Sequence, residues 1–106
     1  MSINDLVKEE ANRQVDSAIE DIPTDRKKYG SPLGKTILQY KDLSDFLLGY
    51  EFGYIIGVCM LYYNNQVKQS GREGITEEED RQVTRDIETV IVDRLPEIRQ
   101  AISRTS

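Results

Sequence analysis

The chain has 106 residues, 31% of them charged and 38% hydrophobic, with a net charge of −5, which is typical of one folded domain. An acidic chain disfavours general nucleic-acid binding, because the neutralisation of phosphates supplies most of that affinity. The chain has no histidine, and this excludes histidine-dependent nucleophilic sites and histidine-ligated zinc.

The cysteine content and the N-terminal residues bear on the compartment of the protein. Cys59 is the single cysteine, so an internal disulfide is excluded. Charged residues are spread through the first twenty positions, which disfavours a secretory signal there. We therefore expect a cytoplasmic protein, and no pattern in the sequence predicts a metal site or a cofactor.

Residues 2–22 have the pattern of an amphipathic helix. Ser2 followed by Asp5 forms an N-cap pair, and Pro23 is expected to end the helix. Apolar residues recur at helical spacings in one narrow stripe: Ile3, Val7, Val15, Ala18, Ile19 and Ile22. The stripe predicts a helix that packs one face against two others.

Residues 23–41 show no long hydrophobic period. The segment contains the helix breakers Pro23, Gly30, Pro32 and Gly34. We expect a long ordered loop between the first two long helices, pinned to the bundle by its apolar residues. A short helix or an extended piece near Thr36–Tyr40 is an open alternative.

This predicted loop is also the only basic part of the chain. Residues 23–43 hold five lysines and arginines against two aspartates, a net charge of +3. The candidate docking residues are Arg26, Lys27, Lys28, Tyr29 and Lys35. They could dock an acidic protein, a phosphate-bearing ligand or single-stranded nucleic acid. The simpler interpretation, which we favour, is that the loop neutralises the acidic helices beside it.

Residues 30–36 read Gly-Ser-Pro-Leu-Gly-Lys-Thr and superficially resemble a phosphate-binding loop. The motif has three rather than four residues between its glycines, and no buried strand precedes it. Pro32 also lacks the amide that a phosphate cradle would use. Nucleotide hydrolysis is therefore disfavoured.

The second long helix is predicted over residues 43–70. Its part from Phe46 to Tyr63 is apolar almost all round, and Glu51 is the only charged residue within it. Such a helix is buried on every side, either in a protein core or in a membrane. The mid-span carboxylate and the scattered aromatic residues disfavour the membrane, so we expect a core helix.

Three glycines recur every fourth residue along this helix. Gly49, Gly53 and Gly57 form one ridge, which Met60 continues. Each helical glycine costs about 1 kcal/mol relative to alanine, so three on one face indicate close approach of a partner. The alternatives are another helix of the same chain, a second copy in a homodimer, and a ligand lying along the ridge.

Glu51 lies on the opposite side of this helix from the glycines. A buried carboxylate must be paired, hydrogen-bonded or protonated. Glu51 reaches a solvated rim of the bundle in our preferred interpretation. The alternatives are a buried ion pair with Arg94, hydrogen bonds to tyrosine hydroxyls, and a functional acid.

The third long helix is predicted over residues 76–104. Thr76 and Glu79 form a capping box at its start. The apolar face consists of Val83, Ile87, Val90, Ile91, Leu95, Ile98 and Ile102. Pro96 interrupts the helix, either as a kink or in the first turn of a separate short helix that begins near Leu95.

The sequence as a whole predicts an all-α three-helix bundle in a single domain, residues 1–106. No catalytic constellation is present, so we expect a non-enzymatic protein–protein interaction module: an oligomeric adaptor, a regulator or a small inhibitor. The expected partner is a second copy or another protein, while nucleic acid and membranes are disfavoured. The alternative function is a carrier of a small hydrophobic ligand or lipid, in a pocket beside the glycine-lined helix.

Overall fold

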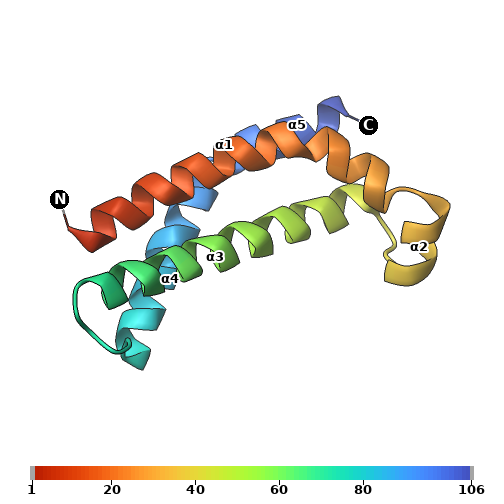
Figure 1. The fold of residues 1–106 in the computed structure, drawn as a ribbon. Coiled ribbons are helices and arrows are strands. Elements are labelled where there is room, and N and C mark those ends of the chain that lie inside the picture. Colours follow the sequence, from red (N-terminus) through yellow and green to blue (C-terminus); the bar gives the residue numbers. More distant parts are fainter. Residues whose placement is uncertain (1, 106) are drawn as a thin grey trace.

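The computed structural model describes residues 2–105, which form five helices and no strand. The helices are α1 (Ile3–Tyr29), α2 (Pro32–Leu38), α3 (Leu43–Gln69), α4 (Glu77–Asp93) and α5 (Leu95–Arg104). α1 and α3 run antiparallel and side by side, α4 and α5 lie behind them, and α2 projects at one end (Figure 1). The all-α class is confirmed, whereas the predicted number of three helices is wrong for the described residues.

α1 begins as predicted but does not end at Pro23. The capping box forms, because the Asp5 amide donates to Ser2 Oγ and the Ser2 amide donates to the Asp5 carboxylate. An interior proline costs roughly 3 kcal/mol, yet the helix continues to Tyr29. Contacts with α5 and its C-cap hold this last part: Arg26 donates from Nη2 to the Ile102 carbonyl (3.0 Å) and from Nε to Oγ1 of the C-cap residue Thr105 (2.8 Å).

The predicted long loop over residues 23–41 is therefore wrong. Of its four breakers, Gly30 caps the end of α1 and Pro32 begins α2, whereas Pro23 and Gly34 lie within the helices. Ser31 caps α2 by accepting from the Gly34 amide, and Pro32 lies in the first turn. Gly34 packs so closely on the preceding turn that a Cβ there would lie 2.5 Å from the Tyr29 carbonyl oxygen. α2 ends at Leu38 and is followed by the C-cap residue Gln39, whose φ of 52° is left-handed.

The third predicted helix is divided as one of the two alternatives proposed. The capping box of Thr76 and Glu79 starts α4. The helix is interrupted at Arg94, and α5 then begins at Leu95 with Pro96 in its first turn. Pro96 thus lies where its missing amide proton costs no helical hydrogen bond.

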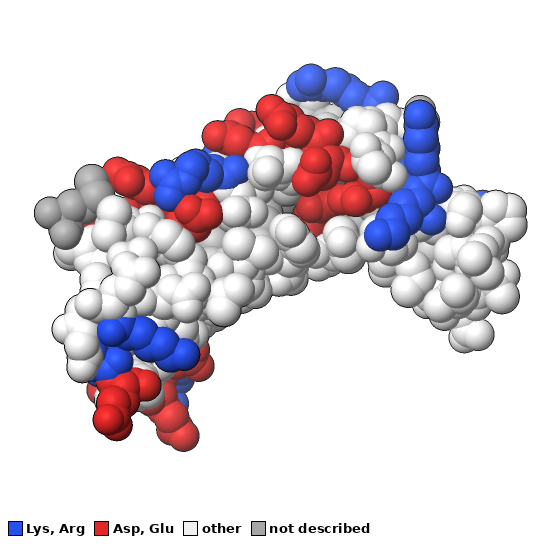
Figure 2. Space-filling view, viewed as in Figure 1, with Lys and Arg blue, Asp and Glu red and all other residues white. Residues whose placement is uncertain are grey.

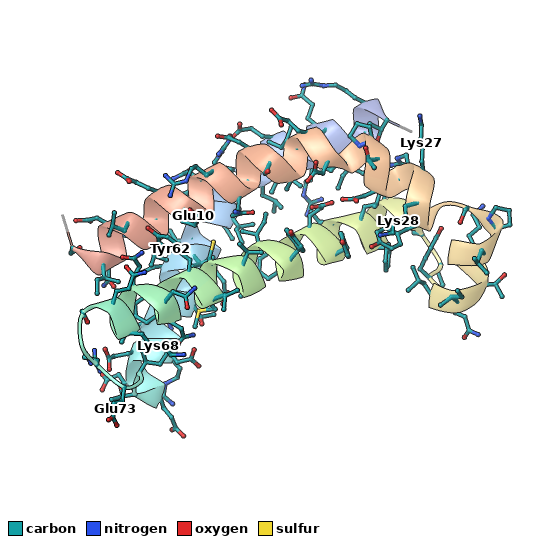
Figure 3. All side chains as sticks on the ribbon, in the orientation of Figure 1. Glu10, Lys27, Lys28, Tyr62, Lys68 and Glu73 are labelled. Atoms are coloured by element: carbon teal, nitrogen blue, oxygen red, sulfur yellow. The ribbon has the colours of Figure 1, made fainter. Side chains whose placement is uncertain are left out.

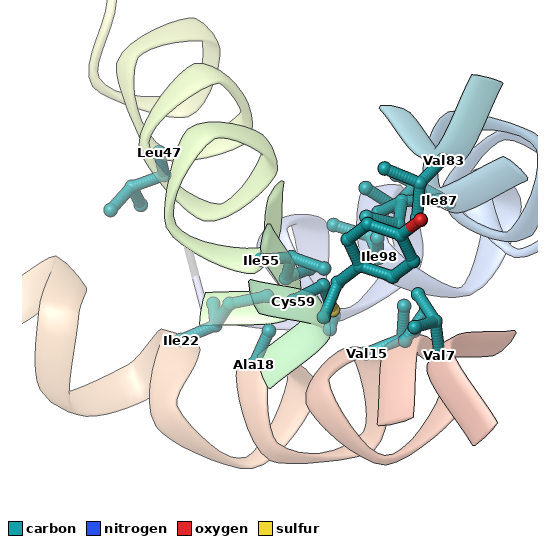
Figure 4. Packing of buried hydrophobic residues seen from close by; sticks show 14 of the residues in the cluster. Val7, Val15, Ala18, Ile22, Leu47, Ile55, Cys59, Val83, Ile87 and Ile98 are labelled. Atoms are coloured by element: carbon teal, nitrogen blue, oxygen red, sulfur yellow. The ribbon is translucent and has the colours of Figure 1, made fainter. Parts of the chain in front are cut away.

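The core is formed by one stripe from each long helix and by α5 (Figure 4). α1 contributes Val7, Ala11, Val15, Ala18 and Ile22. α3 contributes every fourth residue, namely Leu47, Glu51, Ile55, Cys59, Tyr63 and Val67. The prediction that this apolar helix is buried on every side is wrong, because the face of α3 opposite this stripe is exposed.

Candidate functional site

The exposed side of α3, which we call the outer face, carries the three glycines together with Tyr54 and Leu61. A Cβ built on Gly49, Gly53 or Gly57 meets no atom within 4 Å, so no helix of this chain covers the ridge. Packing of the ridge within the chain, the first of our three alternatives, is therefore wrong. Tyr54 is 53% exposed and Leu61 is 64% exposed.

Met60, predicted to continue the ridge, lies partly buried toward α4. Its sulfur lies 3.6 Å from the hydroxyl oxygen of Thr84 on α4, which donates to the Asp80 carbonyl oxygen at 2.8 Å. Met60 therefore borders the outer face and also helps to hold α3 against α4.

The outer face leaves a large part of an apolar helix uncovered. An 18-residue window of α3 has a mean hydropathy of 1.4, and only 28% of that window is buried. Among the described residues, α3 alone is long and apolar enough to cross a membrane, a test that core helices of soluble proteins also pass. Figure 2 shows the strip along α3 free of charged side chains, on the concave lower edge of the molecule between α2 and the start of α4.

Glu51 lies on the buried stripe of α3, and its residue is only 2% exposed. The preferred interpretation, a solvated rim, is therefore wrong. The ion pair with Arg94 is also absent from the described contacts, since Arg94 instead binds Asp16 at 2.5 Å and Glu97 at 2.9 Å. The Glu51 Oε1 atom is buried and has no hydrogen-bond partner.

The side chain of Glu51 lines a cavity of about 210 Å³ between α1 and α3. The cavity lining consists of Gln14, Ser17, Ala18, Asp21 and Asp25 from α1, and Tyr50, Glu51 and Tyr54 from α3. Burial, a hydrogen bond with Asp25, and the negative charges of Asp25 and Asp21 raise the pKa of Glu51 to about 8. The protonated and ionised forms of Glu51 are therefore both populated near neutral pH.

Sequence reasoning missed the two aspartates that accompany Glu51. Gln14, Ser17, Asp21 and Asp25 recur every three or four residues, so they form a polar line along α1 beside its apolar stripe. That spacing was visible in the sequence. Its position opposite Glu51 depends on how α1 and α3 align, which no local pattern reveals.

The structure divides the five predicted docking residues into two groups. Arg26 is tied to α5, and the Tyr29 ring packs against Tyr50 with centroids 4.9 Å apart. Lys27, Lys28 and Lys35 are exposed around the junction of α1 and α2. Only these three lysines remain available to a partner of the opposite charge.

Chemically reactive groups are sparse in the described part of the chain. Burial raises the pKa of the Cys59 thiol to about 11, so it is a neutral, inert part of the core at physiological pH. Within residues 2–105, no three acidic, cysteine or histidine side chains are grouped so that they could hold a metal ion. No family model, curated protein or solved structure matches this chain.

Proposed function

We propose that the chain is a protein–protein interaction module that self-associates through the outer face of α3. The observation that carries this proposal is the uncovered apolar surface of α3, with three glycines whose Cβ positions are open. Helical glycines cost stability within the monomer, and close contact with another helix recovers that cost. Exposed apolar patches of this kind mark interaction sites on soluble proteins.

The distribution of charge favours a second copy as the occupant. The α1–α2 end carries the basic residues 23–43, with a net charge of +3, and Lys27 and Lys28 project there (Figure 3). The opposite end, residues 68–81, holds five acidic residues against three cations, a net charge of −2. An antiparallel pair brings the basic end of each copy to the acidic end of the other.

The spacing of the outer face also fits a two-fold pair. Gly53 and Leu61 lie four residues on either side of Gly57. With the two-fold axis at Gly57, the Leu61 side chain of each copy lies over the open Gly53 of the other. Each interface then has the same patch on both copies, as closed dimers require.

Molar mass measured by light scattering on a sizing column, in detergent-free buffer, tests the proposal. We expect a stable dimer, with twice the 12.2 kDa mass of the chain. Gly53→Leu should yield a folded monomer, because the added side chain has room in one chain but occupies the space of the partner's Leu61. Gly53→Ala is the control and should remain dimeric, with a helix more stable by about 1 kcal/mol.

A monomeric wild-type protein over a wide concentration range would remove the proposal. Recovery of the protein only with detergent or lipid vesicles would instead assign the outer face of α3 to a membrane. The hydrophobic carrier is less well supported, because polar and acidic side chains dominate the cavity beside α3. A binding module also remains our proposal over an enzyme.

A further inference from the structure

The geometry points to a binding site for a small organic ammonium ion in the cavity between α1 and α3. The site borders the proposed dimer contact at Tyr54, which lies on the outer face of α3 and also lines the cavity, but the inference does not depend on self-association. The ligand class is a primary alkyl amine, such as one end of a diamine. The cavity volume of about 210 Å³ suits a slender ligand of this kind better than a drug-sized molecule.

The charge of the cavity wall favours a cation. Asp21 and Asp25 from α1 face Glu51 from α3, and no lysine or arginine is among the eight lining residues. The charges that raise the pKa of Glu51 are those of these two carboxylates, both negative. A positive group in the cavity therefore relieves the repulsion among three acids that the fold brings together.

Glu51 supplies the observation that points to a ligand. It is 98% buried, it lines the cavity, and its Oε1 atom has no partner. Its neighbours along the buried stripe of α3, Leu47 and Ile55, are apolar and fully buried. An ammonium group can donate hydrogen bonds to three acceptors at once, so it can satisfy Glu51 Oε1 and still reach the aspartates.

Two tyrosines distinguish an organic cation from a metal ion. The rings of Tyr50 and Tyr54 stack with centroids 6.2 Å apart and both line the cavity. Aromatic faces attract ammonium groups and accommodate the methylene chain attached to them. Glu51, Asp21 and Asp25 share this cavity, but neither they nor any other three acidic, cysteine or histidine side chains within residues 2–105 are grouped so that they could hold a metal ion.

The titration of Glu51 gives the binding a pH signature. Ammonium binding requires the ionised carboxylate, and the pKa of Glu51 lies near 8 in the free protein. Binding should therefore tighten from pH 6 to pH 9 and release protons at pH 7. The groups facing Glu51 in the cavity are Asp21, Asp25, Tyr50 and Tyr54, and none of them contributes a cation.

Calorimetric titration of the full chain with cadaverine at pH 8 tests the inference. We expect one saturable site per chain, at least tenfold weaker binding in Glu51→Gln, and unchanged binding in Glu20→Gln, an exposed acid on α1. Asp25→Asn, at the half-buried edge of the cavity, should also weaken binding. Helical dichroism of each variant establishes that it is folded.

Further titrations separate this site from general attraction to an acidic protein. Pentanol, which lacks the ammonium group, should not bind. Magnesium chloride, added to give the same concentration of positive charge as the cadaverine, should not displace cadaverine from the site. A lysine side chain carries the same primary ammonium group, so Nα-acetyl-lysine amide is titrated in parallel. Binding of either amine that depends on Glu51 supports the site. No saturable binding of either amine, or equal binding by wild type and Glu51→Gln, would overturn the inference.

Discussion

Glu51 makes the stability of the fold depend on pH in an unusual direction. Its pKa is raised from an ordinary 4.5 to about 8, chiefly by burial and then by Asp25 and Asp21. Between these two values the folded chain holds a proton that the unfolded chain has lost. The contribution of Glu51 to stability is therefore complete below about pH 4.5 and is lost as the pH rises through 8.

Glu51→Gln should remove this dependence, because the amide has a similar shape and does not ionise. We expect the wild-type free energy of unfolding to fall between pH 6 and pH 9, and the variant to be more stable at pH 9 by about 1–3 kcal/mol. Urea unfolding at several pH values measures the difference. Glu20→Gln is the control and should follow the wild type; the same slope in Glu51→Gln would contradict the account.

Arg26 ties the end of α1 to the end of the chain. It contacts Thr105, the Ile102 carbonyl and Ser44, whereas the neighbouring Lys27 is exposed. Arg26→Ala should cost about 1–3 kcal/mol, since the Ile102 carbonyl and the Thr105 hydroxyl lose a charged donor. Lys27→Ala should change the free energy of unfolding by less than about 0.5 kcal/mol. Equal losses in the free energy of unfolding for the two substitutions would show that the contacts of Arg26 do not stabilise the fold.

At the scale of the elements, helix starts were easier to predict than helix ends. Ser2 and Thr76 predict the starts of α1 and α4, because each capping box joins residues only three positions apart in the sequence. The end of α1 depends instead on contacts of Arg26 and Tyr29 with distant residues, and these contacts outweigh the local cost of Pro23. The same limit explains why the sequence leaves a short helix near Thr36–Tyr40 only as an open alternative, whereas the structure has α2 over Pro32–Leu38.

The capping box of α4 gives a test with two threonines. Thr76→Ala removes the side chain that accepts from the Glu79 amide, and it should destabilise the protein by about 1 kcal/mol. Thr89→Ala makes the same chemical change at an exposed position in the middle of α4, where alanine is the better helix former. Thermal or urea unfolding should therefore show a loss for the first variant and a slight gain for the second. A gain in both would contradict the role of the cap.

The exposure of α3 shows why the candidate site was only partly predictable. The composition of Phe46–Tyr63 correctly indicated a large apolar surface, but composition does not tell whether the same chain covers it. The sequence identifies Glu51 as unusual, but which side chains surround it depends on the alignment of α1 with α3. Asp21 and Asp25 became part of the site only through that alignment.

For the whole molecule, segregated charge predicts a salt-sensitive dimer. In the dimer that we propose, the apolar outer face supplies the contact, while the basic and acidic ends set its antiparallel direction. Raising the salt concentration from 0.05 to about 0.5 M shortens the screening length and should weaken the dimer severalfold without unfolding it. Sedimentation equilibrium measures the dissociation constant. If the dimer instead tightens steadily as salt is added, association through the apolar face would still hold, but the pairing of basic and acidic ends would be contradicted.

The central claim, an antiparallel pair centred on Gly57, is tested most directly by disulfide cross-linking. Gly57→Cys places a thiol at the proposed two-fold axis, where it can form a disulfide with the same cysteine of the other copy. Gly49→Cys lies eight residues away, so its two copies should be separated by about 24 Å. The buried Cys59 of the wild-type chain serves as the unreactive control.

Under mild oxidation at low protein concentration, we predict a covalent dimer with Gly57→Cys, little with Gly49→Cys and none with the wild type. Equal cross-linking at both positions would instead indicate a parallel pair. No covalent dimer with either variant would contradict self-association through the outer face of α3.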